Sequence, residues 1–281
     1  KLGKKFFFEF LLNKKIRWHV SYRSNVNMKN LKLKEFKVIQ NLNKNRFLAD
    51  PFIIQRNKRN FIFLEDFYFS KNKGVISCYE ILNENEKFLG TVLEENFHLS
   101  FPYLFNYKNQ IFMCPETHQK EEIRIYICEK FPYKWKFYKT LIKNINAVDT
   151  ILFEKDNIWW MFTSTSNKSI KDFNELNIFY SENGPLTDNW HTHSLNPVVV
   201  NPNIARNGGV VFDKEKIFRI SQKNRSNIYG ESFSINEIKI LDKKNFKEEI
   251  IQNVFPKFKN RLKGTHHLNN YGNFFVNDFC L

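Results

Sequence analysis

The chain has 281 residues, and its 44 Lys and Arg residues against 29 Asp and Glu residues give a formal net charge of +15. Aromatic residues make up 17% of the sequence and Phe alone occurs 31 times, which excludes a disordered chain. No apolar run reaches the roughly eighteen residues that a membrane-spanning helix needs. Because Phe, Ile, Tyr and Asn favour strands and turns, the composition argues against a helical bundle.

The positive charge comes mostly from lysine. The chain contains 37 Asn and 34 Lys but only 10 Arg. We interpret this surplus mainly as compositional bias together with a solvated Lys surface. The alternative is an anionic partner: nucleic acid, a membrane surface or an acidic glycan. We expect no nucleic-acid partner, because base and phosphate recognition favour Arg and the sequence contains no nucleic-acid-binding motif.

The four cysteines, Cys78, Cys114, Cys128 and Cys280, show no CxxC spacing, so we predict no structural zinc site. Cys78 and Cys128 lie in apolar runs typical of strands and are expected to pack as small hydrophobic residues. This pattern fits a reducing compartment, and we expect a cytoplasmic location and no cofactor.

Along the chain, the main pattern is a repeat of fifty to sixty residues. Five segments share a polar residue, a short apolar strand, a turn and a second strand rich in Phe and Ile; they open near positions 50, 100, 149, 206 and 266. Third and fourth strands follow in four of the units, but the fifth unit runs out of chain after its second strand. Two N-terminal segments, 16–23 and 31–40, can supply the missing pair.

This arrangement predicts an all-β fold, a five-bladed β-propeller with four-stranded blades. The propeller would span residues 16–281, with its last blade closed by the N-terminal strands. Residues 1–15 would be a leader or packing arm.

Polar residues are expected to gather at one mouth of the central channel. In each blade the first strand begins, and the antiparallel second strand ends, at the same face. The predicted set is Asp50, Glu65, Asp66, His98, Ser100, Glu116, Asp149, Thr163, Arg206, Arg219, Gln222, Thr265, His266 and Asn277, with Tyr229 among the nearby aromatic residues. Grouped carboxylates suit glycosyl transfer or hydrolysis, in which one carboxylate activates water or attacks and another group protonates the leaving oxygen. A metal at His266 has no support from ligand spacing, and we predict none.

Several short motifs occur in a characteristic order, among them ADPF (49–52), HLSFPYLF (98–105), AVDTILF (147–153), AR-x-GG (205–209) and GTHH (264–267). From about residue 45 to the end, the chain resembles the N-terminal domain of plant glucosamine inositolphosphorylceramide transferases. Similar domains occur in bacterial surface-polysaccharide proteins, some beside formyltransferase or glycosyltransferase domains. The family is in turn similar to the five-bladed furanosidase-type propellers, such as arabinanases and invertases.

The furanosidase resemblance implies roles for two residues. Asp50 matches the Asp that opens the first blade as base or nucleophile, and Asp149 matches the Asp that opens the third. The fourth blade departs from the pattern, because it opens with Ala205 to Gly208 where the relatives usually carry a Glu as general acid. The acid would then be Glu116, Glu65 or His266.

Two functions remain open. In the first, the domain cleaves or transfers a glycosyl unit of a cell-surface polysaccharide or glycolipid, and its catalytic residues are Asp50, Asp149, Glu116 and His266. The expected substrate-binding residues are Glu65, His98, Arg206, Arg219, Gln222 and Tyr229, of which the two arginines would bind an anionic substituent. In the second, the domain is a non-catalytic glycan-binding module that assists a glycosyltransferase or formyltransferase, either associated with it or encoded on the same chain.

Overall fold

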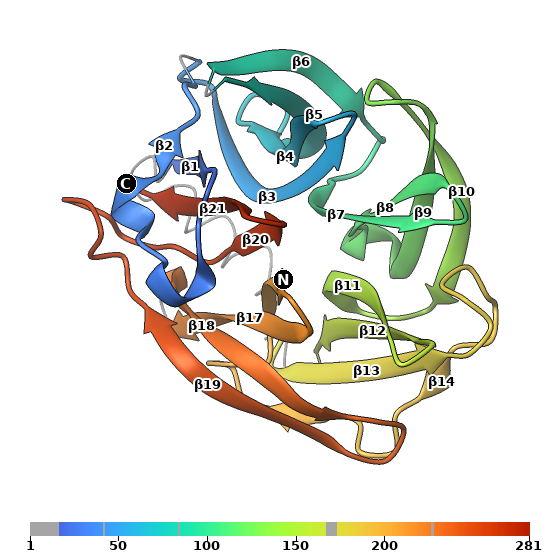
Figure 1. Cartoon of the computed structure of the whole chain (residues 1–281). Helices are drawn as coiled ribbons and strands as arrows, with labels where there is room; N and C mark the ends of the chain where they lie inside the picture. Colours follow the sequence, from blue (N-terminus) through green and yellow to red (C-terminus); the bar gives the residue numbers. More distant parts are fainter. Residues whose placement is uncertain (1–16, 42, 84, 167–172, 226–227) are drawn as a thin grey trace.

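The computed structural model describes residues 17–41, 43–83, 85–166, 173–225 and 228–281. In this part of the chain, five antiparallel sheets surround a central axis (Figure 1), which confirms the predicted five-bladed β-propeller. The predicted leader, residues 1–15, lies outside the described residues. No helix in the described ranges is long and apolar enough to cross a membrane.

The first two blades follow the chain in order, from the innermost to the outermost strand. Blade 1 contains β3 (Arg46–Arg56), β4 (Arg59–Tyr68), β5 (Lys73–Leu82) and β6 (Asn85–Leu93). Blade 2 contains β7 (Ser100–Tyr107), β8 (Gln110–Glu116), β9 (Glu122–Lys130) and β10 (Lys134–Lys143), with a short 3-10 helix at His118–Lys120.

Blades 3 and 4 follow the same order, with one variation. Blade 3 contains β11 (Ala147–Lys155), β12 (Ile158–Thr165) and β13 (Glu175–Ser181); its outer position is divided between β14 (His191–Thr192) and β15 (Val199–Val200), which both pair with β13. Blade 4 contains β16 (Asn207–Asp213), β17 (Lys216–Arg225), β18 (Ile228–Leu241) and β19 (Phe246–Val254).

Blade 5 joins the two ends of the described chain, as predicted. Its inner strands are β20 (Leu268–Tyr271) and β21 (Phe274–Cys280), and its outer strands are β1 (Trp18–Arg23) and β2 (Lys37–Val38). The strand expected over residues 31–40 is shorter than predicted, because a 3-10 helix at Leu33–Glu35 interrupts that segment. Closure in this way completes the last four-stranded blade with strands from both ends of the described chain.

Aromatic packing between neighbouring blades accounts for the phenylalanine content. The Phe52 ring of β3 meets the Phe101 ring of β7 edge-on at 4.8 Å, and Phe63 meets Trp135 at 5.5 Å in the same way. All four side chains are buried. Such edge-to-face pairs stabilise a structure beyond the area they bury, so these aromatic side chains help to hold blade 1 against blade 2.

The feature that positions the site is a β-bulge on the innermost strands. In blade 1, Asp50 and Pro51 lie opposite the single residue Leu64 of β4. The same register shift occurs at Phe101 and Pro102, at Asp149 and Thr150, and at Gly208 and Gly209. In blade 5, three residues between Gly264 and Leu268 face two on β21. A bulge re-aims the side chain it carries, so five bulges at one level direct one position of every blade toward the same place.

The closure can be tested at Val20, which is fully buried on β1. Val20→Ala removes methyl groups from the closing blade and should lower the free energy of unfolding by about 1–3 kcal/mol. Val200→Ala is the matched control, because Val200 is 64% exposed and should change stability by less than about 0.5 kcal/mol. Urea-induced unfolding of both variants measures the difference. Equal effects would contradict a closing role for β1.

Candidate functional site

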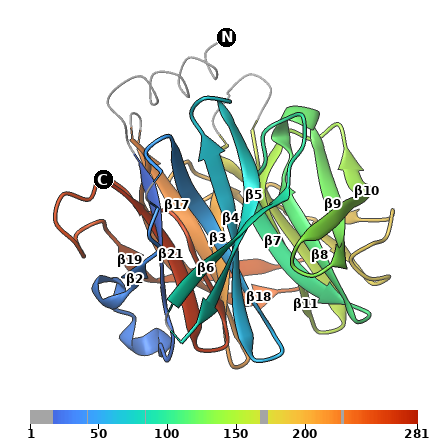
Figure 2. The same ribbon diagram turned by 90° about the horizontal axis from the view of Figure 1, so that it is seen from above.

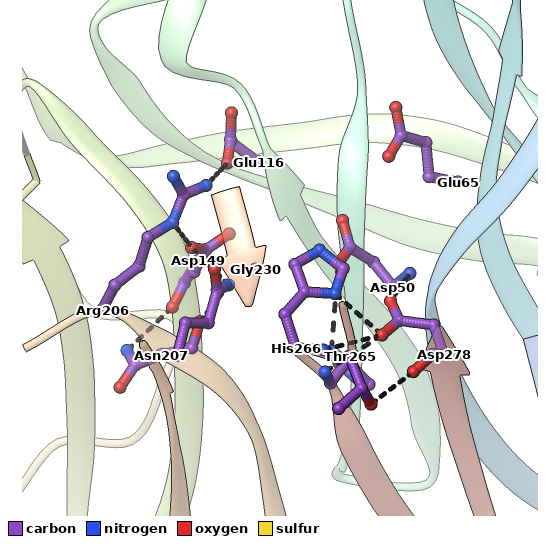
Figure 3. Close-up of polar contacts among 12 residues, drawn as sticks. Asp50, Glu65, Glu116, Asp149, Arg206, Asn207, Gly230, Thr265, His266 and Asp278 are labelled. Carbon is purple, nitrogen blue, oxygen red and sulfur yellow. Dashed lines mark hydrogen bonds and ion pairs between the residues drawn. The ribbon is translucent and has the colours of Figure 1, made fainter. Parts of the chain in front are cut away.

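Charged side chains from all five blades meet where the innermost strands begin (Figure 3). We call this group the channel-mouth cluster; it contains Asp50, Glu65, Glu116, Asp149, Arg206, His266 and Asp278. Six of these seven residues belong to the predicted set, and Asp278 does not.

The backbone at the bulges aims the two aspartates of the cluster. Asp50 has φ +49° and Asp149 has φ +52°, a left-handed conformation that is uncommon for residues other than glycine. In blade 4 the equivalent residue is Gly208, where an added Cβ would lie 2.2 Å from the carbonyl oxygen of His266. Blade 4 therefore has no room for a third carboxylate at this level, and Arg206 reaches the cluster from just before β16 instead.

Asp278 organises the blade 5 side of the cluster. One of its carboxylate oxygens accepts hydrogen bonds from the backbone N–H groups of His266 (3.2 Å) and His267 (3.1 Å), and also contacts His266 Nδ1 at 2.7 Å. The other oxygen accepts from the backbone N–H of Asp50 at 3.1 Å. Burial alone would raise the pKa of Asp278, but the charge and hydrogen bond of His266 outweigh burial and lower it.

His266 lies between two carboxylates. Its Nδ1 atom faces Asp278, and its Nε2 atom lies 3.5 Å from Asp50 Oδ1. The ring stacks on Trp18 of β1 at 4.0 Å. Burial would lower the pKa of His266, but Asp278 and Asp50 together raise it above its ordinary value. The imidazolium form is thus favoured here.

Asp50 is held in place but has one oxygen without a hydrogen-bond donor. Its side chain is only 6% exposed, and its Oδ1 atom makes no hydrogen bond. Burial raises the pKa of Asp50 to about 7, with His266 opposing that rise and Asp278 and Asp149 adding to it. A carboxyl group of this kind exchanges its proton near neutral pH, as a general base does.

Asp149 is paired with a cation. Arg206 Nε contacts its Oδ2 atom at 2.5 Å, and Gln222 Nε2 lies 3.3 Å from the same oxygen. Asn207 donates to the Asp149 backbone carbonyl at 2.8 Å. The guanidinium of Arg206 also lies over the Tyr229 ring, 5.0 Å from its centroid. These contacts fix Asp149 and Arg206 as one unit.

Glu116 lies at the edge of that unit. Its Oε2 atom is 4.0 Å from Arg206 Nη2, and its side chain is 12% exposed. Burial raises the pKa of Glu116 well above its usual range, and the neighbouring Asp149 charge raises it further while Arg206 opposes the rise. The raised pKa favours the protonated form of this carboxyl group, which is the form that a general acid needs.

Glu65 pairs with His98. Nε2 of His98 lies 3.4 Å from Glu65 Oε1, while its Nδ1 accepts a hydrogen bond from the Gly74 backbone N–H at 2.9 Å. Because Nδ1 is an acceptor, the neutral ring carries its proton on Nε2. Burial lowers the pKa of His98 to about 4 and raises that of Glu65 well above its usual range.

Two of the predicted substrate-binding residues lie beneath the cluster. Arg219 is fully buried and donates to Glu248, Asn207 and the carbonyl oxygens of Ile204 and Ala205. A substrate contact would require those bonds to break. Gln222 is fully buried as well, but it positions Asp149 directly.

His266 and the two carboxylates beside it are the group of described residues that comes nearest to a metal site. Ligand atoms of Asp50, His266 and Asp278 lie within 4.8 Å of one another. However, His266 Nδ1 is already bonded to Asp278, and Asp278 also accepts hydrogen bonds from backbone N–H groups. That leaves one oxygen of Asp50 and one ring nitrogen, a smaller donor set than divalent cations usually take.

Asp278→Asn tests the electrostatic role of Asp278. The change removes the charge that raises the pKa of His266, so the imidazole should titrate at lower pH in NMR spectra. The folded pKa of Asp278 lies below 3.8, and the wild-type ion pair loses its stabilising effect as pH falls through it. The folded pKa of His266 lies above 6.5, and the effect is also lost as pH rises through that value. The variant should therefore lose most stability between about pH 4 and 6.5. Asp213→Asn, in the β16–β17 hairpin, is the control, and an unchanged His266 titration in Asp278→Asn would contradict the assignment.

Comparison with solved structures agrees with the fold. A family 117 glycoside hydrolase from Zobellia galactanivorans superposes with a TM-score of 0.58 at 12% identity, covering 95% of this chain and 91% of that one. The catalytic domain of a Coprinopsis cinerea GH62 α-L-arabinofuranosidase superposes with a TM-score of 0.56 at 11% identity, covering 92% and 85%. At such low identity the likeness shows the architecture alone.

Sequence comparison shows the family. The chain is 36% identical over 207 residues to glucosamine inositolphosphorylceramide transferase 1 of Oryza sativa subsp. japonica, and 31% identical over 208 residues to that of Arabidopsis thaliana. Each match covers 72% of this chain but only 27% of the relative. The profile of the family described as "Glucosamine inositolphosphorylceramide transferase 1, N-terminal" matches residues 23–274. The chain therefore belongs to this family of N-terminal domains, confirming the resemblance found in its motifs.

Proposed function

We propose that this domain cleaves or transfers a glycosyl unit of a cell-surface polysaccharide or glycolipid at the channel-mouth cluster. The observation that carries the proposal is Asp50, which projects from a strained bulge, is almost fully buried and has an oxygen without a hydrogen-bond donor. Backbone strain and unsatisfied buried acceptors are concentrated where proteins do chemistry.

The proton states of the carboxyl groups support an acid–base pair. With its pKa near 7, Asp50 is the base or nucleophile. Glu116, whose raised pKa favours its protonated form, is the acid that protonates the leaving oxygen. Asp149, held by Arg206, orients the substrate and raises the pKa of Glu116 by its charge.

Glu116 is a better acid than the two alternatives. His266 is held on both sides by carboxylates, so its proton is stabilised rather than offered. Glu65 lies against His98, whose Nε2–H faces it. Glu116 also keeps the more exposed carboxyl group, 12% against 8% for Glu65.

Turnover of aryl glycosides and oligosaccharides can assign the two roles. Asp50→Asn should reduce kcat about 10²–10⁴-fold on both kinds of substrate, because it removes the base. Glu116→Gln should slow oligosaccharides by a similar factor but spare 4-nitrophenyl glycosides, whose leaving group needs no protonation. Glu65→Gln is the matched control for the acid, and a larger loss in Glu65→Gln than in Glu116→Gln would reverse the assignment.

The pH dependence follows from the same roles. Activity should rise as pH increases through the pKa of Asp50, near 7, because the base must lose its proton. It should fall again above the pKa of Glu116, because the acid must keep its proton. Glu116→Gln should remove the alkaline limb of the kcat/KM profile and leave the acidic limb in place; loss of the acidic limb instead would show that Glu116 is the base.

A second candidate function is glycan binding without cleavage, in support of a transferase. The observation that favours it is the Arg206–Asp149 ion pair, which neutralises one of the two aspartates shared with the furanosidase pattern. Binding of oligosaccharides with no product in the wild-type domain, and unchanged binding by Asp50→Asn, would decide for this function. The curated relatives are transferases by name and this chain spans about a quarter of their length, so a neighbouring transferase domain fits either function.

A further inference from the structure

A second concavity lies at the other end of the propeller. It is a groove of about 960 Å³ between blades 1 and 2, at the upper end of the roughly 300–1,000 Å³ typical of ligand sites. Its walls are the β3–β4, β7–β8 and β9–β10 hairpin turns, of which the first two lie at the lower end in Figure 2. Arg56 in the groove is six residues along β3 from Asp50, or about 20 Å at the usual strand rise. The groove is therefore separate from the channel-mouth cluster.

The groove carries an excess of positive charge. Arg56, Lys108 and Lys130 line it, and in the described part of the chain none of the three forms an ion pair with a carboxylate. The other charges of the lining are already paired, Arg59 with Glu80 inside the groove and Glu129 with Lys134 outside it. Two of the ten arginines in the sequence thus lie here, although arginine is scarce. Three cations without a carboxylate partner favour an anionic ligand.

The rest of the lining has the chemistry of a sugar site. Phe131 lies beneath the Arg56 guanidinium at 5.0 Å, and the neighbouring Tyr133 is 52% exposed. Aromatic faces of this kind combine an apolar surface with a polar rim. Five side-chain amides surround them: Gln55, Asn57, Asn106, Asn109 and Gln110. Amides donate and accept at once, as the hydroxyl groups of a sugar require.

We propose that this groove binds an acidic oligosaccharide, whose carboxylates or sulfates pair with Arg56, Lys108 and Lys130 while its rings lie against Tyr133. An acidic polypeptide would explain the cations but gives no reason for the amide lining. The proposal goes beyond the function of the channel-mouth cluster, because none of the cluster residues takes part. A site of this kind would hold an anionic glycan on the domain while the end of that glycan reaches a different site.

The test uses tetragalacturonate as probe, with a neutral galacto-oligosaccharide of equal length and poly-L-glutamate beside it, in calorimetric titrations. Tetragalacturonate should bind at least tenfold more tightly than either, and its affinity should fall as salt is raised. Lys108→Asn with Lys130→Gln should weaken binding at least tenfold. Asn suits position 108, where φ is +47°.

Cys128 provides a readout of where the ligand binds. It lines the groove and is the only one of the four cysteines that is not buried. Bound tetragalacturonate should slow its alkylation by a maleimide severalfold, and the neutral oligosaccharide should not. Lys216→Asn with Lys247→Gln is the control for the loss of two exposed lysines.

Three results would overturn the proposal. The first is equal affinity for the neutral oligosaccharide, and the second is equal affinity for poly-L-glutamate, which would indicate a general anion surface. The third is binding that leaves Cys128 alkylation unchanged. Unaltered far-UV circular dichroism of the variants would show that any loss of binding comes from the groove and not from unfolding.

Discussion

One carboxylate group, that of Asp278, joins the first and last blades of the ring at the channel mouth. It accepts backbone hydrogen bonds from Asp50, His266 and His267 and holds the His266 ring at 2.7 Å. Hydrogen bonds to a charged acceptor are stronger than those between neutral groups. Because Asp50 and His266 are both fixed through this group, the geometry of the blade 1 and blade 5 side of the site depends on it.

The channel-mouth cluster contains two separate groups of paired charges. On one side, Asp278 and His266 form a buried ion pair beside Asp50. On the other, Arg206 neutralises Asp149 and stands near Glu116. Burying a charge is costly unless it is paired. Arg206 lies 4.0 Å from Glu116 but is already paired with Asp149, and Glu65 faces the His98 ring, so burial raises the pKa of both Glu116 and Glu65. The site therefore holds carboxyl groups whose pKa values are shifted in opposite directions, lowered for Asp278 and raised for Glu65 and Glu116.

The sequence repeat was sufficient to predict the architecture. Strand-length apolar runs at a fixed spacing imply one repeated unit, and the incomplete fifth unit implies closure from the N-terminus; β1 paired with β21 confirms this. The antiparallel direction of the first two strands in each blade also predicted that Asp50, Asp149 and Glu116 lie at one rim. The architecture and the rim residues could both be predicted because they depend on chain length and on strand direction, which can be read from the sequence.

Asp278 and Trp18 were missed for physical reasons. Asn277 was predicted to lie at the channel mouth because the second strand of each hairpin ends there. One extra residue on the inner strand changes which neighbours meet, and a bulge leaves no clear mark in the sequence. A carboxylate within the buried run FFVNDFC was the available signal for Asp278. Trp18 stacks on His266 through the closure of blade 5, and that contact joins segments nearly 250 residues apart. Arg219 was predicted to lie at the rim from the same hairpin geometry, but it is fully buried and bonded within blade 4.

The closure of blade 5 also sets the order in which the site can assemble. Asp50 lies in the first blade, whereas the groups that hold it, Asp278 and His266, belong to the last strands of the ring, and Trp18 comes from the strand that completes it. Without blade 5, the carboxyl groups of the early blades have no imidazolium beside them. The buried acidic groups that distinguish this site therefore have their partner charges in place only when the ring is complete.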